Sequence, residues 1–466
     1  MKKHLLLLLF PATALALPKL DIKPAEPTLP SPQAVQISPN LAKSEKLTLS
    51  EELRANPELT RQMINRAIDS QQFELLPELL RIYEQTPQPD KVLIDYAKGI
   101  ILSQQGELDQ AIRLYRGIIA QYPNFQPVRL RLAQFLFADQ QNEAALDQFR
   151  KLQAEPLPPE IANRVDQYLA ALIARSSWHF NFGLTYVREN NVNNASKARY
   201  IYLGNVPFEK NSESLPQKAN GLSYHFNLAR SFNLLGSHYL HVENQFSGKS
   251  YWDNHAFDDQ QNRTSLGYQF QNAQSRLALL PFYEMRWYGN HRYNRGYGLR
   301  VEAEHWLSPR WQVSLAGEVG QLKYRAGNTA LNGTNGLVSA TLLHAFNAKS
   351  YLYGGVDFLR DLTQDRRLAS KRYSGRLGWS QEWWWGISSR MQVSYGKRKF
   401  DQKHALFNRL RQDRELDVSL TLWHRNLHFW GITPKLTYSY RRVNSNLPDL
   451  YGYDRKRFYV SFERSF

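Results

Sequence analysis

Apolar and polar residues alternate through the C-terminal three-fifths of the chain, and the last segment shows the pattern clearly. Phe458, Val460 and Phe462 fall on one side of an extended chain, polar residues such as Ser461 fall on the other, and the chain ends on Phe466. Successive side chains of a strand point to opposite faces of a sheet. The pattern therefore predicts a strand with one apolar face and one polar face.

Similar alternation, regular in some segments and less so in others, marks fourteen candidate strands between Trp178 and Phe466. They are 178–186, 222–228, 237–246, 265–270, 276–287, 297–307, 311–319, 336–346, 351–359, 373–383, 387–395, 416–422, 430–440 and 458–466. A tilted strand needs about 9–11 residues to cross a bilayer, which many of these segments reach. The sequence therefore predicts a fourteen-stranded antiparallel outer-membrane β-barrel over residues 176–466.

Long and short connections alternate between these segments. The long ones are 190–219, 247–258, 289–294, 326–335, 361–370, 400–409 and 443–453, and the short ones lie near 231–235, 271–274, 308–309, 347–349, 385–386 and 425–427. Outer-membrane barrels have short periplasmic turns and longer external loops. We therefore expect the long loops outside the cell and both ends of the barrel on the periplasmic side.

The first fifty residues divide into a leader and a linker. Lys2 and Lys3 precede an apolar run and a small-residue site at 14–16, so residues 1–16 are expected to be a cleaved signal peptide. Residues 17–50 are rich in proline and are interpreted as an extended spacer or as a docking segment for a periplasmic partner. The chain has no cysteine, so it has no disulfide and no thiol chemistry.

Residues 51–175 are predicted to be a periplasmic helical domain of tetratricopeptide (TPR) type. Gly99 and Ala133, and likewise Ala111 and Ala145, are 34 positions apart, which is the period of that repeat. The predicted packing positions are Gly99, Ala111, Tyr115, Pro123, Ala133, Ala145 and Phe149. A more degenerate unit is expected at 53–85 and a closing helix at 159–175. Generic helical spacing is the alternative interpretation.

The excess of positive charge belongs to the predicted barrel. Residues 1–176 hold 20 Lys and Arg against 20 Asp and Glu, whereas the remainder holds 39 against 22, which accounts for the net charge of +17. Charges are costly on the lipid face, so they belong in the lumen, at the rims or in the loops. The candidate basic residues of the lumen are Arg300, Arg372, Arg376, Arg390, Lys435 and Arg441. A basic interior would attract anionic material, while basic residues at the rims are expected to contact lipopolysaccharide phosphates.

Candidate chemistry is sparse. His255 lies near Asp253, Asp258 and Asp259 in one long loop, but this spacing matches no catalytic or metal-binding motif. We therefore predict no catalytic residue, no cofactor and no metal site, and no enzyme activity. The signal peptide places the protein away from nucleic acid. Most tryptophans lie near predicted strand ends, as the aromatic girdles of membrane barrels do.

The whole chain resembles the surface lipoprotein assembly modulators of Gram-negative bacteria, the translocon of type XI secretion. The resemblance is carried by the repeat pair 99–123 and 126–152, by residues 178–182 running into the Asn-rich segment 190–194, by the strand count and by the terminal strand. It implies an outer-membrane protein that moves client lipoproteins, or soluble haem- or metal-binding proteins, from the periplasm to the cell surface.

The same resemblance implies partners. The helical domain would engage the client or its chaperone below the barrel, and clients of such families often carry small β-barrel domains. Barrel assembly machinery would recognise the terminal strand through Phe458, Val460, Phe462 and Phe466. Two other functions stay open: an exopolysaccharide exporter, which also joins helical repeats to a barrel, and a passive porin or barrel enzyme, which leaves residues 51–175 without a role.

Overall fold

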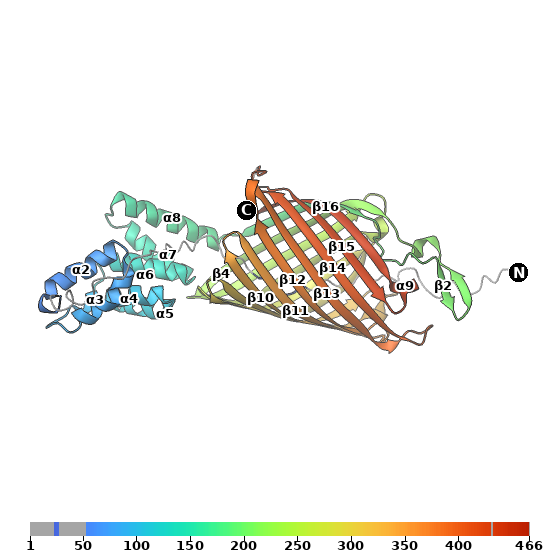
Figure 1. Ribbon diagram of the computed structural model, residues 1–466, viewed down its shortest axis with the longest axis horizontal. Coiled ribbons are helices and arrows are strands. Elements are labelled where there is room, and N and C mark those ends of the chain that lie inside the picture. Colours follow the sequence, from blue (N-terminus) through green and yellow to red (C-terminus); the bar gives the residue numbers. More distant parts are fainter. Residues whose placement is uncertain (1–22, 28–52, 430–431, 466) are drawn as a thin grey trace.

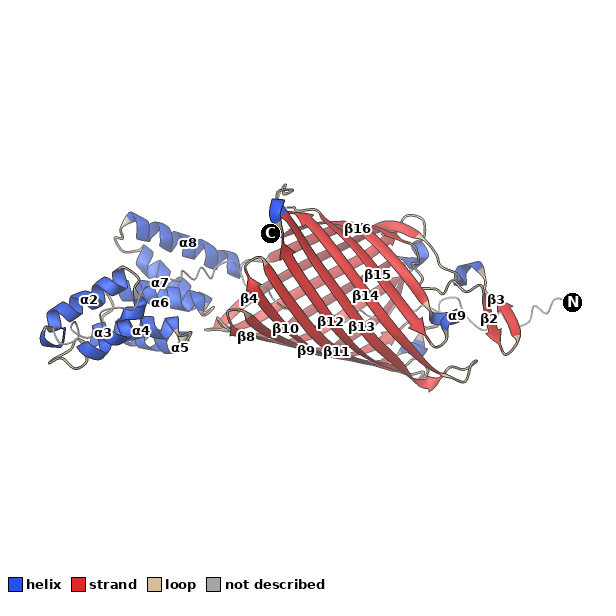
Figure 2. Ribbon diagram, viewed as in Figure 1, coloured by secondary structure: helices blue, strands red, loops and turns tan. Residues whose placement is uncertain are grey.

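The computed structural model describes residues 23–27, 53–429 and 432–465. A group of helices lies at one end of a closed β-barrel, and a small two-stranded hairpin projects from the other end (Figures 1 and 2). The predicted signal peptide, most of the linker, Trp430 and Phe466 lie outside the described residues. In the described part of the chain, no helix is both long enough and apolar enough to cross a bilayer.

The helices form antiparallel pairs. Their bounds are α2 (Pro57–Asp69), α3 (Leu76–Tyr83), α4 (Lys91–Gln104), α5 (Leu108–Gln121), α6 (Gln126–Ala138), α7 (Asn142–Gln153) and α8 (Pro159–Ser176). Asn56 and Asp90 cap α2 and α4 by accepting hydrogen bonds from backbone N–H groups of the first turn. Proline stands at the start of α2, α3, α6 and α8, where its missing N–H costs nothing.

Aromatic rings fill the space that small residues leave between these helices. A Cβ atom added at Gly99 would lie 2.2 Å from the Tyr115 ring, so α4 and α5 approach closely only because position 99 is glycine. The Tyr115 hydroxyl donates to the carbonyl of Tyr96 at 2.6 Å. Phe149 is fully buried and stacks on Tyr168 of α8 with ring centroids 4.8 Å apart. The buried apolar residues form two clusters, one from α2 to α4 and one from α5 to α8, and the half-buried Tyr96 packs against both.

The barrel has fourteen strands, and the predicted fold class is confirmed. They are β1 (His179–Glu189), β4 (Ala219–Leu235), β5 (His238–Tyr251), β6 (Asp259–Gln271), β7 (Ser275–Tyr288), β8 (His291–Ser308), β9 (Trp311–Tyr324), β10 (Gly333–Asn347), β11 (Ser350–Thr363), β12 (Ser370–Glu382), β13 (Ile387–Lys403), β14 (Leu410–His424), β15 (Lys435–Ser445) and β16 (Tyr453–Ser465). Each is antiparallel to its neighbours, and β1 closes the ring against β16, with Glu189 opposite Arg457. Closure leaves no unpaired strand edge in the hydrocarbon layer.

Apolar side chains cover the outside of the barrel. Val338 and Val356, on neighbouring strands, are 63% and 64% exposed, and Phe458 and Phe462 of the terminal strand are also exposed. In a soluble protein such a surface would aggregate, whereas lipid is its natural surrounding. Trp384 and Trp385 stand exposed on the turn between β12 and β13, at the rim nearer the helices.

Three local features differ from the sequence-based expectation. The predicted long loop 289–294 is a tight turn, because β7 and β8 extend to meet at Gly289 and Asn290, which both have positive φ. The strand predicted over 430–440 begins only at Lys435, directly after Pro434, which has no N–H for a strand ladder. The loop after β1 contains an unpredicted hairpin of β2 (Tyr200–Leu203) and β3 (Val206–Glu209).

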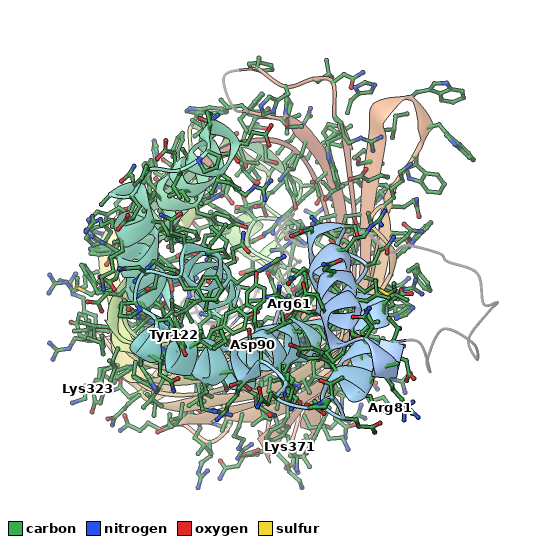
Figure 3. All side chains as sticks on the ribbon, turned by 90° about the vertical axis from the view of Figure 1, so that its left-hand side faces the viewer. Arg61, Arg81, Asp90, Tyr122, Lys323 and Lys371 are labelled. Atoms are coloured by element: carbon green, nitrogen blue, oxygen red, sulfur yellow. The ribbon has the colours of Figure 1, made fainter. Side chains whose placement is uncertain are left out.

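The turn between α6 and α7 contacts the periplasmic turns of the barrel. The Ser237 hydroxyl donates to the carbonyl of Asp139 at 3.4 Å, and the Tyr239 hydroxyl donates to the carbonyl of Gln140. The backbone N–H of Ala273 donates to the Asp139 carboxylate at 3.5 Å. Viewed from this side, the helices lie in front of the barrel end (Figure 3). The helical domain is therefore placed against the turns at one end of the barrel.

Candidate functional site in the barrel lumen

The inner wall of the barrel is built from polar side chains that strand alternation directs away from lipid. Its most buried members include three carboxylates, Glu189, Glu318 and Glu415, each on a different strand. A buried carboxylate is tolerated only when cations and hydrogen-bond donors surround it. Each of the three collects basic side chains from neighbouring strands.

Glu415 on β14 gathers three arginines. Nε of Arg372 lies 3.1 Å from one carboxylate oxygen of Glu415, and Nε of Arg398 lies 2.8 Å from the other. Arg441 on β15 approaches at 3.0 Å. Arg398 also contacts Asp361 of β11 at 3.2 Å. The cluster thus links β11 to β15 and joins three arginines and two carboxylates in one network, so that these arginines are not free to bind other anions.

Glu318 on β9 anchors the other side of the lumen. Arg263 of β6 lies 2.9 Å from it and Arg300 of β8 lies 3.1 Å from it. Arg300 also pairs with Glu302 at 2.6 Å, and Arg263 lies 3.9 Å from Glu284 of β7. This second cluster connects four consecutive strands, β6 to β9.

Glu189 lies at the strand pair that closes the barrel. Arg457 of β16 approaches it at 2.9 Å and Lys249 of β5 at 3.1 Å, and the Tyr251 hydroxyl donates to it at 2.9 Å. The contacts of Glu189 therefore join the last strand to the first strands of the barrel.

The six predicted basic residues of the lumen do not form one site. Arg372 and Arg441 meet at Glu415, whereas Arg300 belongs to the Glu318 cluster. The remaining three lie apart: Arg376 pairs with Asp357 at 3.0 Å, Lys435 pairs with Glu463 at 2.7 Å, and Arg390 is exposed without a carboxylate partner among the described residues. The acids were not predicted, although Glu318 occupies a polar position of the segment 311–319 and Glu415 continues the polar face of the segment 416–422 by one residue.

The loop after β1 lies over the lumen and explains the Asn-rich segment. Asn191 forms two hydrogen bonds with the backbone of Ala195, and Asn193 donates to the carbonyl of Leu215 at 2.8 Å. Asn194, with positive φ, accepts from Arg455 at 2.7 Å. These asparagines bond to the loop itself and to the terminal strand, which holds the loop in place.

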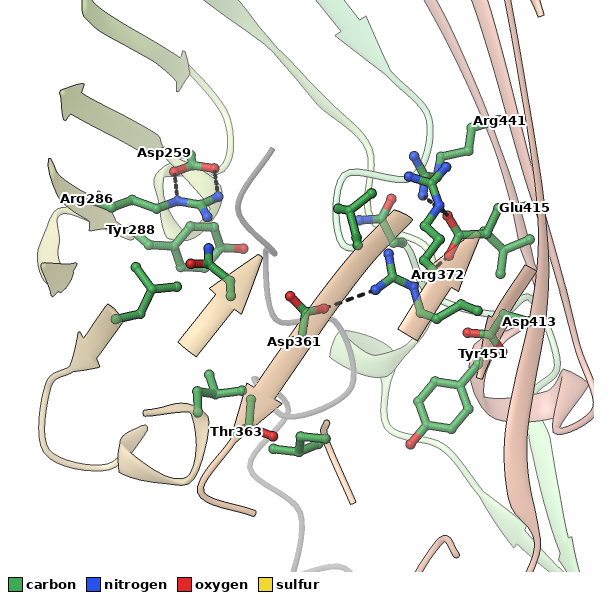
Figure 4. A pocket seen from close by; sticks show the side chains of 18 of the residues that line it. Asp259, Arg286, Tyr288, Asp361, Thr363, Arg372, Asp413, Glu415, Arg441 and Tyr451 are labelled. Carbon is green, nitrogen blue, oxygen red and sulfur yellow. Dashed lines mark hydrogen bonds and ion pairs between the residues drawn. The ribbon is translucent and has the colours of Figure 1, made fainter. Parts of the chain in front are cut away.

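Below this loop the lumen contains a cavity of about 420 Å³. Its wall includes the Glu415 cluster on one side and the Asp259–Arg286 pair on the other (Figure 4). Tyr451 of the short helix α9 (Pro448–Tyr451) also lines it. Pro24, from the N-terminal part of the chain, reaches the same cavity, so a segment far from the barrel in sequence lies inside it.

The acidic residues around His255 form hydrogen bonds and an ion pair that hold the loop and the adjoining strands in place. Nδ1 of His255 lies 3.0 Å from Asp258, which also accepts from the backbone N–H of Tyr251 at 2.7 Å. Asp253 accepts from the backbone N–H of Asn220 at 2.9 Å, and Asp259 pairs with Arg286. Within the described ranges no three His, Cys, Asp or Glu side chains are arranged to hold a metal ion.

Comparison with known proteins identifies relatives along the whole chain. Residues 178–466 match the family described as "Surface lipoprotein assembly modifier", and residues 47–149 match the N-terminal TPR repeats of the same family.

Three curated relatives illustrate the likeness. The chain is 37% identical to surface lipoprotein assembly modifier 1 of Haemophilus influenzae, over 95% of this chain and 92% of that protein. It is 36% identical to surface lipoprotein assembly modifier 1 of Neisseria meningitidis, over 89% and 84%. A hemophilin secretion modulator of Acinetobacter baumannii is 27% identical over 88% and 86%.

Proposed function

Because the chain belongs to the surface lipoprotein assembly modifier family, we propose that it is an outer-membrane translocon that delivers client proteins from the periplasm to the cell surface. The clients are surface lipoproteins or soluble haem- or metal-binding proteins. The observation that carries the proposal is the placement of a helical repeat domain against the periplasmic turns of a closed barrel. A pore for small solutes has no use for such a domain.

The helical domain raises the local concentration of cargo at the barrel mouth. Stacked helical repeats present an extended surface that suits a folded protein or a chaperone with its client. The closing helix α8 leads directly into β1, so cargo held by the repeats is held beside the first barrel strand. We assign the helical domain to client or chaperone binding on this basis.

The paired charges of the lumen suit a passing polypeptide. Arginines that are already bound to Glu318 and Glu415 have less capacity to retain acidic segments of a client than free arginines would. Exposed basic residues on the outside of the distal rim, such as Lys323 and Lys371, are assigned to contact with lipopolysaccharide phosphates (Figure 3). The terminal strand, with Phe458 and Phe462 on the lipid face, is assigned to recognition by the barrel assembly machinery.

The test is delivery of a client to the surface of intact cells. A candidate lipoprotein is expressed alone, with the full chain, or with a form that keeps residues 1–50 and 176–466 but lacks the helical domain. Protease added to intact cells is expected to remove the client only with the full chain. For soluble clients, the amount of a haem-binding client in the culture medium is measured with and without the full chain. Equal protease access with and without the full chain would contradict translocation.

A further inference from the structure

A short segment from the front of the chain lies against the inner wall of the barrel. The backbone N–H of Ala25 donates to the Ser339 hydroxyl at 2.9 Å, and the Thr341 hydroxyl donates to the Ala25 carbonyl at 2.6 Å. Ala25 is 5% exposed. Both polar groups of this residue are therefore satisfied by side chains of β10, although more than three hundred positions separate them in sequence.

The two hydroxyl groups are held in place by charged neighbours. Arg376 donates to the oxygens of Ser339 and Thr341 at 2.9 and 2.6 Å, and it pairs with Asp357 at 3.0 Å. The Ser339 hydroxyl also donates to Asp357 at 2.7 Å. Ser339, Thr341 and Arg376 are each more than nine-tenths buried. A buried polar group requires partners, and this arrangement presents one acceptor and one donor to a backbone in the lumen.

A second set of contacts holds Lys23, two positions before Ala25. Arg300 of the Glu318 cluster donates to the carbonyl of Lys23 at 2.9 Å, and the Lys23 ammonium group lies 3.4 Å from the side-chain oxygen of Gln245 on β5. Contacts from β5, β8 and β10 thus converge on residues 23–25. The wall contacts backbone carbonyls and a backbone N–H, which every polypeptide carries.

The segment itself is suited to this contact. Pro24 and Pro27 have fixed φ, and each restricts the residue before it to extended conformations. Binding an already extended segment costs less conformational entropy than binding a flexible one. The buried position is alanine, so the wall accepts a small side chain at the point where both backbone groups are bound.

We propose that the inner wall at Ser339, Thr341, Arg376 and Arg300 is a binding site for an extended polypeptide backbone. Residues 23–27 of the chain occupy it as an internal ligand and obstruct the lumen, and an incoming extended segment must displace them. The inference rests on contacts within the barrel and not on client delivery, so its tests use the purified or membrane-embedded protein without a client.

The first test is cross-linking, which a chain without cysteine makes unambiguous. The variants are A25C paired with S339C, and A25C paired with T437C as a control, because Thr437 is a buried residue of β15, five strands from β10 around the ring. In outer membranes treated with a mild oxidant, the first pair is expected to form an intramolecular disulfide that changes migration on non-reducing gels. Equal cross-linking of both pairs, or of neither, would overturn the proposal.

The second test is conductance in planar lipid bilayers. Deleting residues 23–27 is expected to raise the single-channel conductance severalfold, whereas deleting residues 33–37 of the same linker is expected to leave it unchanged. A synthetic peptide with residues 19–31 should then block the shortened chain. The same peptide with Ala25→Asp should require about a tenfold higher concentration to block the channel equally, because a charged side chain has to enter the buried position. Unchanged conductance after the first deletion, or equal block by both peptides, would refute the internal ligand.

Discussion

The helical repeats and the barrel bury opposite kinds of side chain. In the helical domain the fully buried residues include Tyr115 and Phe149, and ion pairs such as Arg81–Glu78 lie on the surface. In the barrel, Glu318 and Glu415 are buried inside while Val338 faces outward. The same avoidance of water by apolar groups operates in both, but lipid replaces water outside the barrel.

The contrast predicts two mechanisms of damage. A change in the helical core alters packing, so its cost follows the space available around the side chain. A change in the lumen removes one partner of a buried ion pair and leaves charges without compensation. Substitutions of similar size are therefore expected to act differently in the two regions.

The largest effect is expected from Glu415→Leu. It leaves Arg372, Arg398 and Arg441 without their shared carboxylate, and breaking a buried ion pair of this kind costs about 3–5 kcal/mol of folding free energy. Heat-modifiable migration on gels after a urea series measures the loss of folded barrel.

The matched control for this loss is Glu382→Leu. Glu382 pairs with Arg425 at 3.5 Å in an exposed position, and an exposed pair contributes about 1 kcal/mol at most. Equal urea midpoints for the two variants would show that the Glu415 cluster does not hold the barrel together.

A charge placed on the lipid face tests whether the outer surface of the barrel must be apolar. Phe462→Asp is expected to cost on the order of 2 kcal/mol and to reduce membrane assembly, because an aspartate replaces an exposed apolar ring in the hydrocarbon layer. Deleting Phe466 is expected to impair assembly in the same direction. The folded fraction of the band on unheated gels reports both, with Phe462→Leu as the apolar control that should assemble normally.

Much of the fold followed from sequence because each region repeats one rule many times. Strand alternation and the 34-residue spacing of Gly99 with Ala133 depend only on residues close in sequence. A local exception was not predicted: β15 begins only at Lys435, directly after Pro434, although the alternation starts earlier in the sequence.

The lumen was less predictable because its contacts depend on register between distant segments. Arg372 and Glu415 meet across β12, β13 and β14, and no spacing rule in the sequence pairs them. The contact of Ala25 with Ser339 is an extreme case, since a Pro-rich linker has no periodicity that would place it inside a barrel. Basic residues on polar faces were recognisable, but their neutralisation by particular acids required the closed structure.

A smaller loss of stability is expected when a side chain is added at Gly99, where α4 and α5 approach closely. Gly99→Ala places a Cβ atom 2.2 Å from the Tyr115 ring, so the helices must separate at a cost of about 1–2 kcal/mol. Gly117→Ala is the matched control, because nothing lies within 4 Å of its added Cβ and alanine favours a helix by roughly 0.5–1 kcal/mol. Thermal unfolding followed by circular dichroism at 222 nm should move in opposite directions for the two. A shift in the same direction would show that position 99 is not closely packed.

The smallest effect is expected at the junction of the two regions, where Asp139 lies against the barrel turns. Burial raises the pKa of Asp139 above its ordinary value and outweighs the hydrogen bonds from Gln141 and from the Ala273 N–H, which lower it, while the nearby Asp109 raises it further. Asp139 lies against the barrel turns, so we predict that docking supplies part of this burial and that the docked state holds the proton more tightly than an undocked one. Docking is therefore most favourable below the ordinary pKa near 3.8 and weakens as pH rises through the raised value.

Spin labels at Lys98→Cys and Lys349→Cys would measure this change as the width of the distance distribution between α4 and a periplasmic turn. We expect a narrower distribution at pH 4 than at pH 7, and we expect the difference to disappear in Asp139→Asn, which keeps an oxygen for the N–H of Ala273. A pH-dependent width that survives in Asp139→Asn would assign the change to another group. A width that is independent of pH in the parent chain would mean that the turn between α6 and α7 does not control docking.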